Sequence, residues 1–451
     1  MKGAVIHQLI DALVRAFEQL QADVSLREIE KLASMVHRVM TVQARMYHSA
    51  EHVFDLVDPA SPIQSIAALF HDLVYYQVDL GIAPDVCAIV EPYIEENDGR
   101  IWLLPSVRSG DRLFQLTLDV FGFTIGQLPQ TGANEFLSAL FMNKRLEGMV
   151  QDRDLLRASV CIEATIPFRD RNESGETHFE VLEKRLHEVN VHYGLGLIES
   201  EIEYAIQEAV MFANSDVVSF AEPDAGHFLD STWKLLPEMN VALRSGSLYS
   251  LCDYRQALQR MDQLLWRLDP ELIFHRYKGF PSQLAYRQML DTARRNLMIG
   301  RQYLGVKMLA IAVLEALARV TGGDAPLVLF MGDVVRGGEV IFGLEDLLPL
   351  IPFTVRPDQA ILFEMLDAGR AGDSYFDIRN SPTSLFIFKS LGPAGLEQPL
   401  EQARAMFDGR VEPAEFLKTV DRSVVSAIAR AAAEIVVTRR QALLSWVEDH
   451  A

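Results

Sequence analysis

The chain has 451 residues, a length that allows two or three domains with sizeable cores. Acidic residues outnumber basic ones 62 to 42, which gives a formal net charge of -20. Such a surface repels phosphate backbones, so the charge argues against general nucleic-acid binding and against binding to anionic membranes. A small phosphorylated substrate is still compatible with it, because a bound metal ion supplies a local positive field.

Cysteine usage and hydropathy favour a cytoplasmic protein. Cys87, Cys161 and Cys252 are widely separated and form no Cys-x-x-Cys pair, which favours a reducing compartment. Residues 1–20 are amphipathic and lack the apolar centre of a signal peptide. No run approaches the roughly eighteen apolar residues that a membrane-spanning helix needs, so we expect no membrane segment.

Helical patterns dominate the chain from its start. Apolar residues within 4–20 recur at helical spacing, and Ser25 followed by Glu28 predicts a capping box at the start of the next helix. The fold class is therefore predicted as mostly α. We expect a helical N-terminal domain over residues 1–240 and a second, largely helical C-terminal region over residues 241–451, whose role the sequence does not indicate.

The stretch from Tyr47 to Asp79 carries the clearest chemical signal. His48 and His52 are four residues apart, so on a helix they share one face. His71 and Asp72 directly follow an apolar run, where an ionised carboxylate is costly to bury unless it is paired or bound to a metal. Three imidazoles and one carboxylate on two consecutive helices suit a divalent transition metal.

This pattern, Tyr-His-x-x-x-His and then Ala-x-x-x-His-Asp, resembles the HD-domain superfamily of metal-dependent phosphohydrolases. Its first block is similar to that of cyclic-nucleotide phosphodiesterases and of a group of bacterial HD proteins. The resemblance covers roughly residues 25–240 and implies an HD helical bundle there. It further implies that His52, His71 and Asp72 bind metal, and that His48 stands near the leaving group as a proton donor.

A helix that begins near Ala133 is similar to an Asn-Glu-x-x-Ser-Ala helix of those bacterial proteins, which lies closer to the His-Asp pair there. The resemblance therefore implies an insertion over residues 81–131. Such an insertion either covers the site and shapes substrate choice, or is a surface elaboration or an oligomer contact. Glu135 of this helix either orients water or a ligand imidazole, or is a carboxylate that faces the helix dipole.

Two later positions bear on the number of ligands. Family members often carry Ala-Thr followed closely by a His, whereas this chain has Phe168 at that place, which puts a second metal in doubt. They also close the site with an acidic residue in an Asp-x-Asp-Leu context. Asn214-Ser-Asp216-Val is similar, which implies Asp216 as the fourth protein ligand; its simpler interpretation is a helix cap.

The function predicted from these residues is a metal-dependent phosphohydrolase or phosphodiesterase. Its substrate would be a nucleotide or another small phosphate ester, and its cofactor one or two divalent ions of Mn, Mg, Fe, Co or Zn. His48 suits general acid catalysis because the reference pKa of imidazole is about 6.5. With two metals, the resemblance implies that the carboxylate of Asp72 bridges them.

Two other classes stay open. One is a non-catalytic sensor that uses an HD-type site to bind a metal or nucleotide, with the C-terminal half as its output module. The other is the diiron HD oxygenases, which we rank last because they need additional histidines around the same core. In each case we expect a small-molecule ligand rather than a nucleic acid or membrane, and a homo-oligomer is possible.

Overall fold

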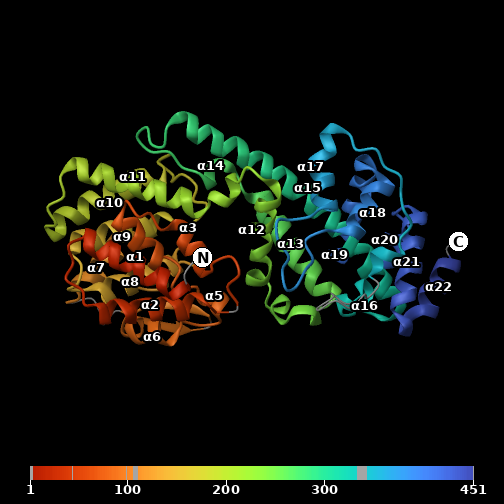
Figure 1. The fold of residues 1–451 in the computed structure, drawn as a ribbon, viewed down its shortest axis with the longest axis horizontal. Helices are drawn as coiled ribbons and strands as arrows, with labels where there is room; N and C mark the ends of the chain where they lie inside the picture. The colour runs from red at the N-terminus through yellow and green to blue at the C-terminus, as the bar shows by residue number, and fades with distance from the viewer. Residues whose placement is uncertain (1–3, 43, 98, 105–109, 333–342, 450–451) are drawn as a thin grey trace. The chain divides into compact units, whose positions relative to one another are not determined.

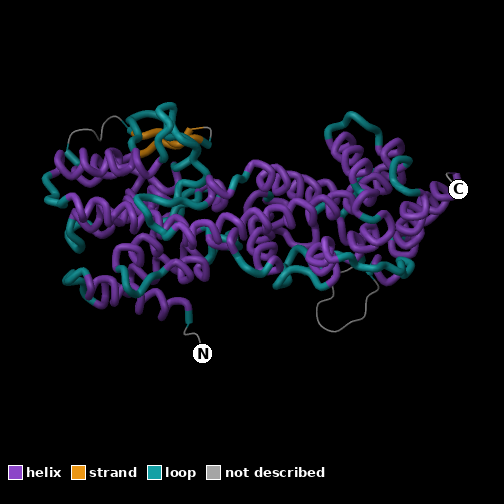
Figure 2. The backbone as a smooth tube through the Cα atoms, turned by 90° about the horizontal axis from the view of Figure 1, so that it is seen from above, coloured by secondary structure: helices purple, strands orange, loops and turns teal. Residues whose placement is uncertain are grey.

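The structure is a computed structural model that describes all residues except 1–3, 43, 98, 105–109, 333–342 and 450–451. The protein is 68% helical, which confirms the mostly α prediction. The strands within the described residues form a single two-stranded sheet (Figure 2). The chain divides into two compact units, the first made of residues 1–221 and 269–291 and the second of residues 222–268 and 292–451.

This division differs from the boundary expected near residue 240. The first unit ends at residue 221 and also includes the later segment 269–291. Hydrogen bonds between residues far apart in sequence hold these segments in their units. The indole N–H of Trp233 donates to Asp377, 2.8 Å away, within the second unit. The amide of Asn214 brackets the backbone of His275 in the first unit, with hydrogen bonds of 2.8 and 2.9 Å.

The first unit is a helical bundle with one small sheet (Figure 1). Its elements are α1 (Val5–Gln19), α2 (Leu26–Met40), α3 (Ala50–Leu56), α4 (Pro62–Phe70), α5 (Tyr76–Asp79), α6 (Pro84–Val90), η1 (Glu91–Tyr93), β1 (Ile94–Asn97), β2 (Arg100–Leu103), α7 (Arg112–Phe121), α8 (Ala133–Leu146), α9 (Asp152–Ala164), α10 (His178–Tyr193), α11 (Glu199–Asp216), η3 (Val218–Ala221) and α14 (Pro270–Ile273).

The regular secondary-structure elements described in the second unit are all helices. Its elements are α12 (Ala225–Met239), η4 (Val241–Leu248), α13 (Leu251–Arg267), α16 (Leu327–Met331), η5 (Leu344–Leu347), η6 (Pro357–Gln359), α17 (Ala360–Asp367), α18 (Pro382–Leu391), η7 (Pro393–Gly395), α19 (Glu397–Phe407), α20 (Pro413–Leu417), α21 (Arg422–Ile435), η8 (Val437–Arg439) and α22 (Arg440–Asp449). The long helix α15 (Gln283–Gly322) contributes residues to both units. No helix among the described residues combines the length and the apolarity that crossing a membrane requires.

Helix α4 lies at the centre of the first unit, in contact with α1 and α9. Its apolar sequence is buried from Ile63 to Phe70. Ser61 caps its start by accepting a hydrogen bond from the backbone N–H of Gln64, and Pro62 occupies the first turn, where its missing N–H costs nothing. The helix ends at Phe70, so His71 emerges at the end of a fully buried helix.

The segment expected as an insertion carries the sheet and the helices α6 and α7. Strands β1 and β2 pair antiparallel, with Ile94 opposite Leu103. The apolar stretch within this segment forms α7, which ends at Gly122 in a left-handed conformation with φ of 65°. Asp111 at the start of α7 pairs with Lys144 of α8 at 2.9 Å, so the segment packs on the bundle.

Two histidine rings of the first unit pack edge to face in a largely buried position. The rings of His178 and His275 meet at right angles with their centroids 4.4 Å apart. Burial lowers both pKa values, and the nearby guanidinium of Arg169 lowers them further; the pKa of His275 falls to about 4. Both imidazoles are therefore neutral at neutral pH in the folded protein.

We expect this pair to make the first unit acid-sensitive. The unfolded chain binds a proton at His275 near its reference pKa of about 6.5, whereas the folded chain does so only near pH 4. Stability is therefore present above pH 6.5 and is lost as the pH falls from 6.5 to 4, by on the order of 2 kcal/mol at pH 5. Urea unfolding of His275→Asn at pH 7.5 and pH 5 should show a smaller loss between the two than the wild type shows. His192→Asn, at an exposed site on the same unit, is the matched control and should keep the wild-type loss.

Candidate metal centre

Three helix ends bring together the four residues expected to bind metal. His52 lies on α3, His71 and Asp72 follow α4, and Asp216 is the last residue of α11. The Nε2 atom of His52 is 3.0 Å from Oδ1 of Asp216 and 3.9 Å from Oδ2 of Asp72. The Nε2 atom of His71 is 3.0 Å from Oδ2 of Asp72 and 3.5 Å from Oδ1 of Asp216.

These separations fit a shared ion. Two ligand atoms that each lie about 2.1 Å from one ion, in tetrahedral or octahedral positions, are about 3.0–3.5 Å apart. His71 Nε2 and Asp72 Oδ2 are buried and, although 3.0 Å apart, do not form a hydrogen bond with each other or with any other described group. With His71 deprotonated at Nε2 both atoms are acceptors, and a divalent cation between them would satisfy both.

The orientation of His71 also fits a ligand. Its Nδ1 atom is 2.9 Å from the carbonyl oxygen of Ala68, one turn earlier in α4. A neutral imidazole that donates from Nδ1 carries its lone pair on Nε2, the atom that faces the two carboxylates. The ring of Phe212 on α11 packs edge-on against His71, with centroids 5.7 Å apart, and holds the imidazole in place.

Electrostatics show how strongly the four groups interact. Burial opposes ionisation of Asp72, but the positive charge of His71 holds the pKa of that carboxyl far below its usual value. For Asp216 burial is likewise outweighed, and the nearby imidazoles of His52 and His71 lower its pKa to about 2. In turn the two carboxylates raise the pKa of His71 against the effect of its burial. The carboxylates therefore stay ionised and form a site of excess negative charge.

The position of Asp216 is itself informative. A carboxylate at the last residue of a helix faces the negative end of the helix dipole, which disfavours it. This argues against the helix-cap interpretation, since acidic caps belong at helix N-termini. Replacement of the first family acid by Asn214 has a separate explanation, because the amide of Asn214 is occupied by the backbone of His275.

Arg45 holds the backbone that carries Asp72, a role that no sequence pattern indicated. Its buried guanidinium donates to the carbonyl oxygens of Asp72 and Leu73. It is paired through two nitrogens with the carboxylate of Asp79, which the sequence had suggested only as a pocket residue. This clamp fixes the turn after α4 and so the direction of the Asp72 carboxylate.

Helix α8 supports the same turn from the other side. The hydroxyl of Ser138 accepts a hydrogen bond from the backbone N–H of Val74 at 2.9 Å, and Asn134 donates to Gln77 at 2.8 Å. Glu135 of this helix lies within the field of the site. Burial raises its pKa to about 7, and the carboxylates of Asp72 and Asp216 add to the effect.

His48 lies beside the four ligands but not on the same helix. We expected His48 and His52 to share a helical face, and this was wrong, because α3 begins only at Ala50. Ser49, in an extended conformation typical of an N-cap, separates His48 from the helix. The rings of His48 and His52 are perpendicular, with centroids 6.0 Å apart, and Tyr75 packs edge-on against His48 at 4.7 Å.

Phe168 occupies the place where the family pattern has a histidine. Its ring packs edge-on against Phe220, with centroids 6.3 Å apart. The neighbouring Arg169 is bound to the buried carboxylate of Glu163, which also binds Arg185. An aromatic ring offers no ligand atom, so Phe168 contributes nothing to a second metal.

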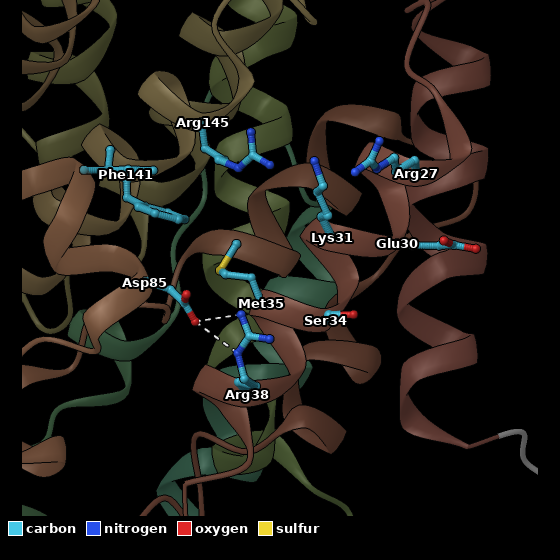
Figure 3. Close-up of a pocket in the computed structure, with 10 residues that line it drawn as sticks. Arg27, Glu30, Lys31, Ser34, Met35, Arg38, Asp85, Phe141 and Arg145 are labelled. Carbon is cyan, nitrogen blue, oxygen red and sulfur yellow. Dashed lines mark hydrogen bonds and ion pairs between the residues drawn. The ribbon is translucent and has the colours of Figure 1, made fainter.

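A separate hollow of about 450 Å³ lies between α2, α6 and α8 and contains none of the candidate ligands (Figure 3). Several cations line it, but the structure pairs them locally. Arg38 binds Asp85 at 2.8 Å, and Lys31 and Arg145 both bind Glu28. Because three of its four cations have acidic partners, we do not assign the phosphate-binding role to this surface.

Comparison of the chain with protein-family models, with curated proteins and with solved structures found no match. The assignment of the site therefore depends on its own geometry and on the sequence pattern.

We expect Asp216→Asn to weaken metal binding by more than about 100-fold, beyond the 10–100-fold typical of losing a supporting residue. The amide lacks the charge that makes the carboxylate a good ligand. Metal content of the purified proteins, measured by mass spectrometry after dialysis against Mn or Co, tests this. Asp55→Asn, which removes an exposed carboxylate from α3 one turn from His52, is the control and should keep wild-type metal content. Equal metal content in the two variants would remove Asp216 from the ligand set.

Proposed function

We propose that the protein is a metal-dependent phosphohydrolase or phosphodiesterase that acts on a nucleotide or another small phosphate ester. The observation that carries the proposal is the convergence of His52, His71, Asp72 and Asp216, with Nε2 of His71 and Oδ2 of Asp72 buried 3.0 Å apart. The resemblance to HD-domain phosphohydrolases supports it, because it had suggested these same residues for this chemistry.

The chain supplies the ligands for one ion. A bound Mn, Mg, Fe, Co or Zn ion would lower the pKa of a coordinated water and offset charge on the phosphoryl group. The side chains of Asp72 and Asp216 are 19% and 16% exposed, whereas His71 is 1% exposed. The site is therefore open to a substrate on its carboxylate side and closed on the side of α4. With Phe168 at the family's histidine position, we propose one ion rather than two.

His48 is assigned the role of general acid. The tyrosine rings of Tyr47 and Tyr75 pack edge-on against it, with centroids 4.9 and 4.7 Å away, and so restrict its orientation. The hydroxyl of Tyr47 is 3.0 Å from that of Ser219, three residues beyond Asp216. This contact connects the loop that carries His48 to the end of α11, and so holds the proton donor next to the ligands.

Glu135 is assigned a supporting role in proton transfer. With a pKa of about 7, its carboxyl group exchanges a proton readily at neutral pH. Because it lies in the field of Asp72 and Asp216, it can accept a proton from a water molecule that enters the site. The charge of Arg169 partly opposes this rise in pKa.

A non-catalytic sensor is the alternative, and Phe168 favours it, since the missing histidine removes a group that catalytic relatives often have. Both functions require the metal site. They differ in turnover, which the next experiment measures.

The cytoplasmic location predicted from the separated cysteines stays a prediction; Cys87, Cys161 and Cys252 are unpaired thiols in the structure.

We expect His48→Ala and His52→Ala to differ in kind. Loss of His52 removes a ligand and should empty or weaken the site. Loss of His48 should leave the metal content near normal and slow turnover about 10²–10⁴-fold, the usual range for a general acid. The slowing should be smaller for a nitrophenyl ester, whose leaving group needs little protonation, than for an alkyl ester with a basic leaving group.

The measurement is metal content and kcat for both variants on the two esters, after a screen of phosphoesters with Mn, Mg, Fe and Co. If His48→Ala loses metal as His52→Ala does, His48 is a ligand. If it keeps metal and full activity on the basic leaving group, the general-acid assignment fails. A metal-loaded wild type that hydrolyses none of the esters would favour the sensor.

A further inference from the structure

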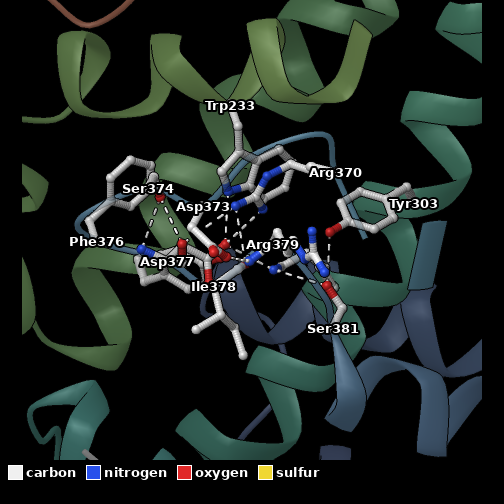
Figure 4. Close-up of polar contacts among 12 residues, drawn as sticks. Trp233, Tyr303, Arg370, Asp373, Ser374, Phe376, Asp377, Ile378, Arg379 and Ser381 are labelled. Atoms are coloured by element: carbon white, nitrogen blue, oxygen red, sulfur yellow. Dashed lines mark hydrogen bonds and ion pairs between the residues drawn. The ribbon is translucent and has the colours of Figure 1, made fainter. Parts of the chain in front are cut away.

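The second unit contains a buried carboxylate with an unusual number of donors (Figure 4). A single oxygen, Oδ2 of Asp377, accepts hydrogen bonds from Trp233 Nε1 and Tyr254 Oη, each at 2.8 Å. The same oxygen is 3.0 Å from Nζ of Lys307 and 3.1 Å from a guanidinium nitrogen of Arg370. Two cations and two neutral donors thus surround one negative charge.

The cluster carries more positive than negative charge. Lys307 and Arg370 are 7% and 2% exposed, and Asp377 is the acidic partner that they share. Aromatic rings offset part of the excess: Lys307 Nζ lies 5.0 Å from the ring centroid of Trp233, and the guanidinium of Arg370 lies 4.7 Å from the same ring. A buried charge without a counterion is costly, so this arrangement favours an anion close by.

A small cavity of about 60 Å³ lies beside the cluster and offers room for such an anion. Lys307, Ser381, Thr383 and Ser384 line it, as do Tyr254, Asn380 and Asp377, whose Oδ2 atom is already surrounded by four donors. Thr383 is 4% exposed, and its Oγ1 atom has no hydrogen-bond partner among the described residues. A buried hydroxyl without a partner is rare in folded proteins, and at the wall of a cavity it indicates a missing ligand.

The cavity also receives the start of α18. Thr383 and Ser384 belong to the first turn of this ten-residue helix, where backbone N–H groups and the helix dipole favour negative charge. Ser381, at the N-cap, does not cap the helix with its side chain, because that hydroxyl lies 2.8 Å from the Tyr303 hydroxyl and 3.2 Å from Lys307. The anion-attracting end of α18 therefore remains uncapped by its own side chain.

The other wall of the cavity is apolar. Aliphatic side chains of α15 and α16 line it, namely Ala310, Ile311, Leu314, Leu327 and Met331, together with Ile378 and Pro382. A ligand that fits must place an anionic group near Thr383 and Lys307 and a short aliphatic part against these residues. The volume leaves room for only a few heavy atoms.

We propose that this cavity binds a small aliphatic carboxylate, with acetate or propionate as the probe. The carboxylate oxygens accept hydrogen bonds from Thr383 and from the first turn of α18, and the ligand charge balances the excess cation of the cluster. Phosphate would place more charge and four polar oxygens against the apolar wall, so it should bind more weakly. The inference is independent of the metal centre, since all of its residues lie in the second unit.

Calorimetric titration of the full-length protein in a buffer without chloride or phosphate tests the proposal. Propionate should bind saturably to the wild type, with phosphate at least about 10-fold weaker. Thr383→Val keeps the shape of the side chain and removes one hydrogen bond to a charged group, so it should weaken propionate binding about 10–100-fold. Thr232→Val is the control, because the buried hydroxyl of Thr232 donates to the carbonyl oxygen of Phe228 in its own helix. It should bind like the wild type.

Absence of saturable propionate binding by the wild type would overturn the proposal, as would equal binding by Thr383→Val and Thr232→Val. Phosphate binding as tight as propionate binding would overturn the carboxylate class. If Thr383→Val does not give the folded circular dichroism spectrum, Ser384→Ala takes its place, with the same expected direction and the same control.

Discussion

Buried carboxylates constrain this structure more than any other group. An ionised carboxylate away from water must be matched by a cation or by several donors, and the surrounding helices are arranged to supply them. In the first unit Asp72 and Asp216 meet at the ends of α4 and α11, where two imidazoles face them. The hydrogen bond from Arg45 to the backbone of Asp72 serves the same need, because a buried carboxylate that moves away from its partners loses the interactions that offset its burial.

A break in secondary structure separates the proposed ligand His52 from the proposed proton donor His48. His52 lies on α3 and faces Asp216, whereas His48 precedes the helix behind Ser49 and packs among tyrosines. Had both been on one helical turn, their rings would have pointed into the same space and competed for the same ion. Because of this break, the ring of His48 is oriented differently from that of His52, while Tyr47 keeps it close to the end of α11.

The sequence predicted best what depends on local pattern. Helical periodicity was sufficient for the mostly α fold, and the adjacency of His71 and Asp72 after an apolar run marked the candidate site. Asp216 came only from a weak motif, since its partners lie far away in sequence and the fold alone brings them together. The role of Arg45 had no local signature, because its contacts are with backbone atoms. The unit boundary was missed for a related reason: α15 runs through it as one unbroken helix.

The charged clusters of the two units have surplus charges of opposite sign. At the metal centre two carboxylates face two imidazoles, and with those imidazoles neutral the site holds two negative charges that a divalent cation neutralises. Around Asp377 the count is reversed, because Lys307 and Arg370 bring two positive charges to a single carboxylate. The first arrangement would suit a divalent cation and the second an anion. A chain of net charge -20 repels anions over most of its surface, so an anion site within it requires such an interior surplus of positive charge.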